Sequence, residues 1–128
     1  MAVGLSPVNV ANKWLDWLRG VAITAPTSVN TKLHTGDPGL GATLPSANAT
    51  RVATTFGAAA GGAIALLNTP TWASWAAGPE TISHLSEHDA LTAGLFLFSA
   101  ALTTPKAVVN GDTLTLTSLS VSLAPLAV

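Results

Sequence analysis

Two histidines and a glutamate, His84, Glu87 and His88, lie close together in the segment His-Leu-Ser-Glu-His. This spacing matches an inverted zinc-protease motif, in which a helix presents both rings to one metal ion. Such a site needs a further protein ligand, and the only acidic residues after Glu87 are Asp89 and Asp112. The β-branched and apolar residues before the motif favour a strand. We therefore predict ordinary polar residues at a strand end, with a zinc hydrolase as the remote alternative.

Other sequence patterns for catalysis are missing. The chain contains no cysteine, which excludes thiol catalysis and cysteine-ligated zinc. It has no Gly-x-Ser-x-Gly segment, and the glycine-rich stretch 57–62 lacks the Lys-Ser/Thr pair of a phosphate-binding loop. A calcium ion at Asp37 would need six to eight oxygen ligands, and no second acidic residue is near in the sequence. We predict neither an enzyme nor a cofactor, and a structural turn at Asp37.

Charge is scarce along the whole chain. Five basic and six acidic residues make up 9% of the 128 residues, against roughly 25% in an ordinary soluble domain. A monomer of 12.8 kDa exposes on the order of 6,000 Å² to water, and so few charges cannot cover that area. We infer a building block whose surface is covered by copies of itself or by a larger assembly.

The distribution of charge and hydropathy excludes further classes of protein. The basic residues do not cluster, so the footprint of a direct nucleic-acid ligand is absent. The longest apolar run, residues 56–67, is too short for a bilayer, which needs roughly 20 residues. Polar residues interrupt the N-terminus where a signal peptide would be apolar. We expect no membrane span and no secretion.

One helix is predicted near the N-terminus, over residues 7–19. Ser6 is a suitable N-cap, Pro7 fits the first helical position, and Gly20 can end the helix in a left-handed conformation. The apolar arc of this helix is broad and includes Trp14 and Trp17. We expect one face to pack on the domain and the other to contact a partner.

The rest of the chain alternates with the period of β-strands. The longest segment, 113–123, changes parity near residues 117–118, which predicts a bulge or a crossing between sheets. Asn110 and Gly111 predict a type I′ turn before it. We predict a single domain, 1–128, with a helical segment over 1–20 and an antiparallel β-sandwich over 21–128. The expected strands are 29–34, 52–56, 64–66, 72–76, 81–87, 95–99, 107–109 and 113–123.

Trp72 and Trp75 have opposite parity on a strand, so an extended segment would bury one ring and expose the other. Three interpretations are open. Both rings belong to the core, or one anchors a neighbouring subunit, or one stacks on a sugar of a receptor.

The segment Leu-His-Thr-Gly-Asp-Pro-Gly at 33–39 carries a family resemblance, together with Ala-Asn-Lys-Trp-Leu at 11–15 and Gly-Leu-Phe-Leu-Phe-Ser at 94–99. With Glu-Thr-Ile-Ser-His at 80–84 and Val-Asn-Gly-Asp-Thr-Leu at 109–114, the chain resembles small structural proteins of tailed phages of actinobacteria. These are labelled tail fibre, minor tail or minor capsid proteins. The resemblance implies a non-enzymatic virion component without catalytic residues.

From these observations we expect an accessory structural protein of the virion, assembled in the cytoplasm of the host bacterium. Capsid decoration ranks first, and a minor tail or tail-fibre protein with a receptor-binding role is the alternative. The expected partners are further copies of the chain, for example in a trimer, and the major capsid protein or tail proteins. The candidate contact residues are Trp14, Trp17, Trp72, Trp75, Leu123, Leu126 and Val128.

Overall fold

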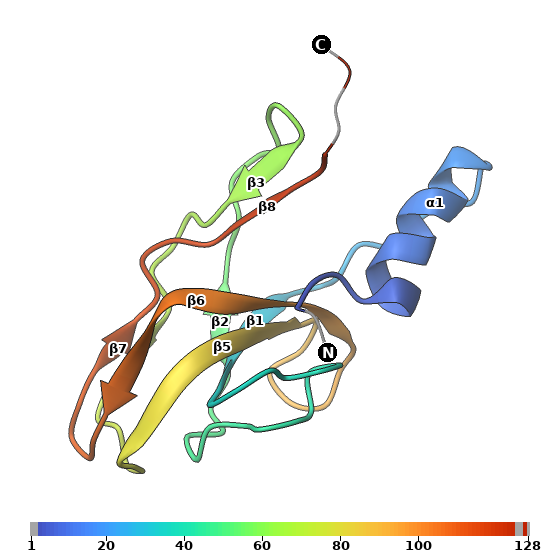
Figure 1. Cartoon of the computed structure of the whole chain (residues 1–128). Helices are drawn as coiled ribbons and strands as arrows, with labels where there is room; N and C mark the ends of the chain where they lie inside the picture. The colour runs from blue at the N-terminus through green and yellow to red at the C-terminus, as the bar shows by residue number, and fades with distance from the viewer. Residues whose placement is uncertain (1–2, 125–126, 128) are drawn as a thin grey trace.

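The computed structural model describes residues 3–124 and 127, which form a mainly β protein with one helical segment at the N-terminus (Figure 1). The predicted fold class, antiparallel β-sheets with an N-terminal helix, is confirmed. The helical segment is a π-helical turn, Pro7–Ala11, that continues as α1, Asn12–Leu18. The strands are β1 (Val29–His34), β2 (Val52–Thr54), β3 (Ala63–Ala65), β4 (Thr71–Trp72), β5 (Glu80–His88), β6 (Phe96–Val108), β7 (Leu114–Thr115) and β8 (Ser120–Ser122).

A four-stranded antiparallel sheet in the order β2-β1-β5-β6 is the centre of the molecule. On its first face lie Leu33 and Leu85, which are directly opposite each other on β1 and β5. Trp72 of β4 belongs to the same buried cluster, and Leu114 of β7 packs against it. The two-stranded sheet β4-β7 is therefore the second layer over this face, and the main core lies between the two layers.

The second face of the central sheet is polar. It carries His34 of β1 and Ser86 and His88 of β5, all of them buried. The loop 35–48 covers this face, as shown by the Thr43 carbonyl, which lies 2.8 Å from the His34 Nδ1 atom, and by Gly41, which lies against the His88 side chain. The sheet thus has an apolar face under strands and a polar face under a loop.

β6 is one strand of 13 residues, although the sequence predicts two separate strands at 95–99 and 107–109. The expected break coincides with an irregularity in the pairing, where Ile82 is opposite Lys106 but His84 is opposite Ala101. Pro105 falls inside this irregular stretch, and β6 is the last strand of the sheet. An edge strand tolerates a proline at a bulge because the missing N–H removes no necessary hydrogen bond.

The segment 113–123 divides between two sheets. β7 pairs with β4, whereas β8 pairs with β3, so the parity change near residues 117–118 marks the predicted crossing between sheets. The preceding turn differs from the prediction. The Asp112 N–H donates to the Val109 carbonyl across the turn, but only Gly111 has a positive φ, at 92°. This is the pattern of a type II turn and not of type I′.

The helical segment begins as predicted. The Ser6 hydroxyl accepts a hydrogen bond of 3.1 Å from the Asn9 N–H, and Pro7 occupies the first turn. Gly20, with a φ of 87°, follows the end of the helix. The segment is attached to the sheet at its start, where the Ser6 N–H donates to the Leu97 carbonyl of β6 at 2.7 Å and the Asn9 side-chain amide donates to the Phe96 carbonyl at 2.9 Å.

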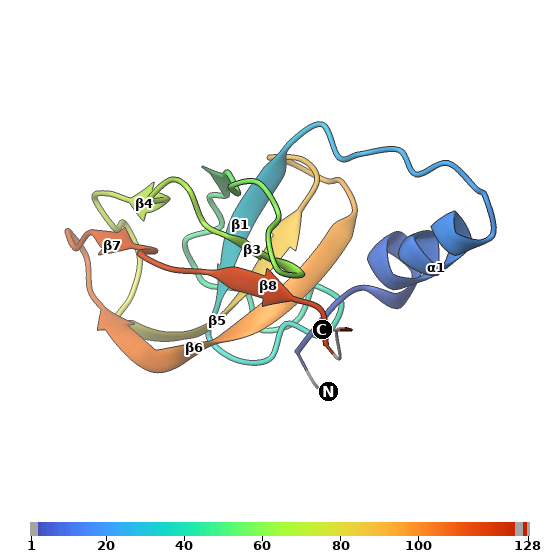
Figure 2. The ribbon, with the colours of Figure 1, turned by 90° about the horizontal axis from the view of Figure 1, so that it is seen from above.

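Two parts project from this body. Figures 1 and 2 show α1 standing away on one side, and β3 with β8 extending as a narrow ribbon, which we call the arm. The exposed area of the chain is 7544 Å², whereas a compact protein of this mass exposes on the order of 6,000 Å². A larger exposed area is expected of a chain whose arm and helix project from its body.

Candidate interaction surface

The His-Leu-Ser-Glu-His motif lies on β5, as the strand prediction requires. Four residues along a strand span about 13 Å, so the rings of His84 and His88 are too far apart to share one ion. Glu87 projects from the opposite face of the strand, where it is directly across from Thr31. Among the described residues, no three His, Asp or Glu side chains form a group that could hold a metal. The three weak metal candidates therefore do not converge.

The buried histidines instead form a chain of hydrogen bonds on the polar face. His34 Nδ1 lies 2.8 Å from the Thr43 carbonyl, which can only accept, so this nitrogen carries the proton. His34 Nε2 then accepts from the Ser86 hydroxyl at 2.8 Å. His88 Nε2 in turn donates to the Ser86 oxygen at 3.0 Å. Burial lowers the pKa of His88 to about 4, so this chain joins neutral side chains.

Glu87 is fully buried on the apolar face. Its Oε1 accepts from the Thr31 hydroxyl, which also contacts the Thr54 hydroxyl. Among the described side chains, Glu87 Oε2 and His88 Nδ1 are the buried polar atoms that lack a hydrogen-bond partner. Desolvation raises the pKa of Glu87 to about 7 against the weaker effect of the threonine hydrogen bonds. Glu87 and His88 are both closed off from solvent, so their carboxyl and imidazole groups affect the stability of the fold and do not face an open site.

The loop after β1 is a structural turn that closes over the polar face. Asp37 Oδ1 accepts a hydrogen bond of 2.8 Å from the Gly39 N–H, as the turn prediction requires. The Thr35 hydroxyl donates to the Leu44 carbonyl across the loop. Gly41 has a φ of 85°, and a Cβ at this position would meet Phe96 Cδ2 at 2.7 Å. Only glycine lets this loop approach the sheet so closely.

Trp72 and Trp75 are wrong as candidate partner contacts, because both rings are buried within the chain, with exposed fractions of 3% and 0%. The Trp72 indole N–H donates to the Thr50 carbonyl at 2.9 Å, and that of Trp75 donates to Glu80 at 3.2 Å. The parity argument fails because Ser74 has a φ of 53°, which turns the chain and brings the second ring inward. Neither ring can stack on a sugar or anchor a subunit.

The side chains of α1, in contrast to Trp72 and Trp75, are mostly exposed. Every residue of α1 except Asp16 is exposed. Trp17 and Leu18 have exposed fractions of 63% and 74%, and Leu15 one of 64%. Large apolar side chains on a short projecting helix are unusual for a surface that faces only water. Trp14 and Trp17 are therefore accessible to a partner. The helix face that was expected to pack on the domain instead lines a groove, with Val10, Lys13 and Trp14 among the lining residues.

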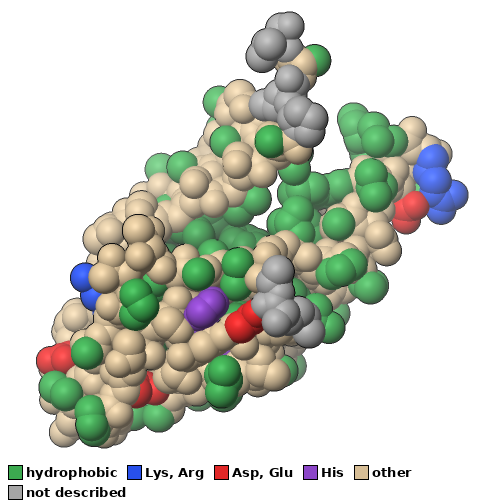
Figure 3. Space-filling view, in the orientation of Figure 1, with side chains coloured by type: hydrophobic (Ala, Val, Ile, Leu, Met, Phe, Trp, Pro, Cys, Tyr) green, Lys and Arg blue, Asp and Glu red, His purple; other side chains and the backbone are tan. Residues whose placement is uncertain are grey.

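An apolar groove of about 460 Å³ separates α1 from the body and the arm. Figure 3 shows hydrophobic side chains gathered in this hollow, and charged side chains at the outer end of the helix. The rings of Phe56 and Phe98 lie at its floor, with centroids 6.3 Å apart. Sequence analysis missed this groove because its walls come from distant segments. The lining residues include Val10, Trp14, Ile23, Phe56, Ile64, Leu97, Phe98 and Val121.

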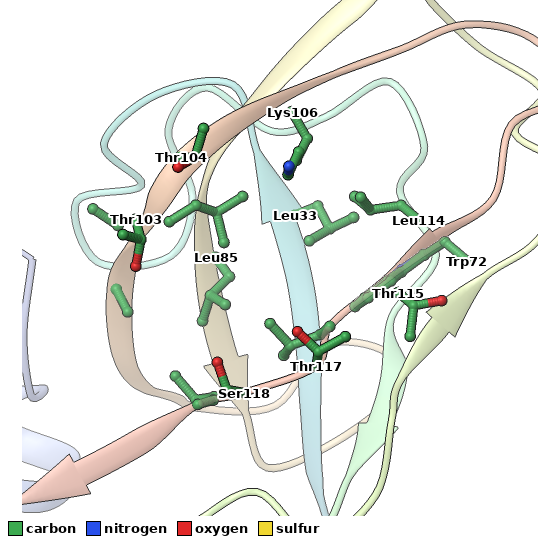
Figure 4. Close-up of a pocket in the computed structure, with 15 residues that line it drawn as sticks. Leu33, Trp72, Leu85, Thr103, Thr104, Lys106, Leu114, Thr115, Thr117 and Ser118 are labelled. Carbon is green, nitrogen blue, oxygen red and sulfur yellow. The ribbon is translucent and has the colours of Figure 1, made fainter.

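A second, smaller cavity of about 290 Å³ lies between the central sheet and the crossing from β7 to β8. Leu33 and Leu85 project into it from the sheet, and Leu114 and Thr117 line the other side (Figure 4). Lys106 is exposed and lines the same cavity. Aliphatic and hydroxyl groups dominate this lining, so the cavity lacks an acid–base pair for catalysis.

The C-terminal candidates fall into two groups. Leu123 follows β8 and has an exposed fraction of 48%. Leu126 and Val128 lie outside the described residues. In the described part of the chain, no helix is long and apolar enough to cross a bilayer.

Comparison with protein families identifies the family of this chain. The sequence profile of a protein family described as Podophage GP4 fiber I protein gp80 matches residues 6–124. The match includes the helical segment, the loop over the polar face, the central sheet and the arm. A comparison with curated proteins finds no match. The chain belongs to the family of phage fibre-type structural proteins described as Podophage GP4 fiber I protein gp80.

Proposed function

We propose that the chain is a non-enzymatic structural subunit of a phage fibre, held in the virion by its N-terminal helix. The observation that carries this proposal is the exposure of Trp17 and Leu18 on α1. Tryptophan is enriched among the residues that contribute most to protein interfaces. A virion protein with an apolar surface is the partner that such a helix fits, because Leu15, Trp17 and Leu18 are exposed and Asp16 already pairs with Arg19 of the same segment at 2.7 Å.

The family match supports a fibre role over capsid decoration, which ranked first on the sequence. Receptor binding through tryptophan stacking is not supported, because Trp72 and Trp75 are buried. Assembly in the host cytoplasm and incorporation into the virion follow from the proposed role. Capsid decoration stays a prediction that imaging of the particle tests.

The test is incorporation into phage particles. A phage that encodes Trp17→Ser with Leu18→Ser should yield particles that contain at most a small fraction of the wild-type amount of this protein. The matched control is Leu67→Ser, which replaces a leucine of similar exposure, 73%, in the segment after β3. Quantitative mass spectrometry of purified particles measures both variants.

Normal incorporation of the helix double variant would contradict attachment through α1. Electron cryomicroscopy of wild-type particles locates the protein independently of any variant. Density for this fold at a fibre supports the proposal, and density spread over the capsid lattice would replace it with decoration.

A further inference from the structure

Among residues 3–124, the outer edge of β8 has no strand partner, whereas the outer edge of β3 has one. β3 continues its hydrogen bonding to the chain itself. The Gly57 N–H donates to the Ala65 carbonyl at 2.9 Å, and Ala60 and Ala63 exchange two hydrogen bonds of 2.9 and 3.0 Å. The arm therefore has one open side, which is formed by β8.

The hydrogen-bond pattern identifies the groups on this open side. Across the arm, the Leu66 N–H donates to the Leu119 carbonyl at 2.8 Å, and the Leu123 N–H donates to the Gly62 carbonyl at 2.9 Å. In an antiparallel pair, the residues between bonded positions direct their backbone groups away from the partner strand. The N–H and C=O groups of Ser120 and Ser122 therefore point outward, and both residues are exposed.

This edge lacks the usual protection against pairing. Natural edge strands are blocked by charged side chains, prolines or bulges. Residues 113–124 contain no charged residue and no proline. Two short strands by themselves are marginally stable in water, so the arm would gain stability from another strand on its open side.

The sequence of the edge identifies the strand that fits it. Residues 119–123 read Leu-Ser-Val-Ser-Leu, which is the same in both directions. When such a segment pairs with its own copy in an antiparallel orientation, each residue is opposite one of the same type. Serine then lies across from serine and leucine across from leucine, so the apolar side chains of both copies lie on one face of the ribbon.

We propose that β8 pairs with β8 of a second copy of this chain, antiparallel and about a twofold axis at Val121. Ser120 of one copy then exchanges backbone hydrogen bonds with Ser122 of the other. The four strands form one continuous sheet in the order β3-β8-β8-β3. Leu123 packs beside Leu119 of the other copy, which covers the half-exposed Leu123 side chain. The surface is isologous, so the assembly closes as a dimer.

The proposed register can be tested by a single cysteine, because the natural chain has none. In this register the two Val121 residues form a non-hydrogen-bonded pair with Cα atoms about 4.5 Å apart, a distance that a disulfide can bridge. Oxidation of Val121→Cys should give a covalent dimer of nearly all the protein. Ser120→Cys is the matched control, because Ser120 residues of the two copies lie diagonally, about 7–8 Å apart, and should stay uncrosslinked.

The contribution of the backbone is tested by Ser120→Pro. This substitution removes an outward N–H and leaves the bonds between β8 and β3 intact. Sedimentation equilibrium should show the wild type as a dimer and a loss of association of at least about tenfold in the variant, since the twofold axis doubles the lost hydrogen bond. Ser120→Ala retains the N–H and should stay dimeric.

A wild type that is monomeric at every concentration would overturn the proposal, and so would equal crosslinking of Val121→Cys and Ser120→Cys. A dimer that Ser120→Pro does not weaken would overturn it as well. If Ser120→Pro fails to fold, judged by circular dichroism, the cysteine pair decides. Trp17→Ser with Leu18→Ser should leave the dimer intact, which separates this edge from the helix that the proposed function requires.

Discussion

The central sheet buries polar side chains, whereas the projecting helix exposes apolar ones. The sheet buries Glu87 and His34 completely. The helix α1 exposes Trp17 and Leu18 to water. The sheet tolerates a buried carboxyl group because a buried apolar core packs against the same sheet. The helix and the arm instead leave apolar side chains and backbone groups exposed, which another protein could cover. Exposed apolar side chains, and not a lack of charge, distinguish the helix, because Lys13, Asp16 and Arg19 lie in or directly after it.

The sharpest way to test this comparison is to make the same substitution in both regions. Trp75→Ala removes a fully buried ring from the core and should lower the free energy of unfolding by about 3–5 kcal/mol. Trp17→Ala removes an exposed ring and should change it by less than about 0.5 kcal/mol. Urea denaturation followed by circular dichroism measures both. Similar losses in the two variants would mean that α1 packs on the body in solution.

The second test uses pH and the buried carboxyl group of Glu87. Its pKa is raised from 4.5 to about 7 in the folded protein. The protonated carboxyl group therefore favours the folded state. Its contribution to the free energy of unfolding is complete below pH 4.5 and is lost as the pH rises through about 7. The free-energy difference between wild type and Glu87→Gln should therefore shift by about 3 kcal/mol against the wild type between pH 4.5 and 8.

The comparison with Glu87→Gln is necessary because His88 acts in the opposite direction. Its pKa is lowered to about 4, chiefly by burial, so its stabilisation is present above pH 6.5 and is lost as the pH falls through about 4. The two groups partly cancel in the wild type. Urea titrations of both proteins across this range measure the difference, and parallel pH profiles would show that the Glu87 carboxyl group is hydrated in solution.

The smallest expected effect concerns the start of the helical segment. Ser6→Ala removes the hydroxyl that accepts from the Asn9 N–H and should destabilise the first turn by about 1 kcal/mol. Because the helix is attached at this end, hydrogen exchange should become faster for the amides of residues 9–12 and stay unchanged in β5. Ser118→Ala, on an exposed position of the β7–β8 crossing, is the control. Faster exchange throughout β5 would mean that the helix and the sheet unfold together.

Local patterns predicted the parts of the fold that local forces determine. β1 has the predicted bounds, because its alternation coincides with one apolar and one polar face of the sheet. The N-terminal helix was recognised by Ser6 and Gly20, which act within one turn of its ends. The parity change near residues 117–118 located the crossing between sheets, since a strand that changes its layer must also change the face that it buries.

The remaining features depend on contacts between distant segments. The left-handed conformation of Ser74, which buries Trp75, has no signal in a serine residue. The continuity of β6 through Pro105 depends on its place at the edge of the sheet. The groove required Phe56, which follows β2, to meet Phe98 of β6. Of the candidate site, the sequence could therefore predict the exposed helix but not the groove beside it or the open edge of β8.

The attachment of the helical segment also determines how mechanical load enters the molecule. A pull on α1 reaches the body by two routes. The Ser6 N–H and the Asn9 side-chain amide hold the Leu97 and Phe96 carbonyls of β6 at 2.7 and 2.9 Å, and the backbone of residues 19–28 leads into β1, which pairs with β5. β6 passes this force to β5 along its antiparallel pairing. Tension would thus be distributed over many hydrogen bonds in the longest ladder of the protein, and the buried tryptophan core would not be the first part to yield.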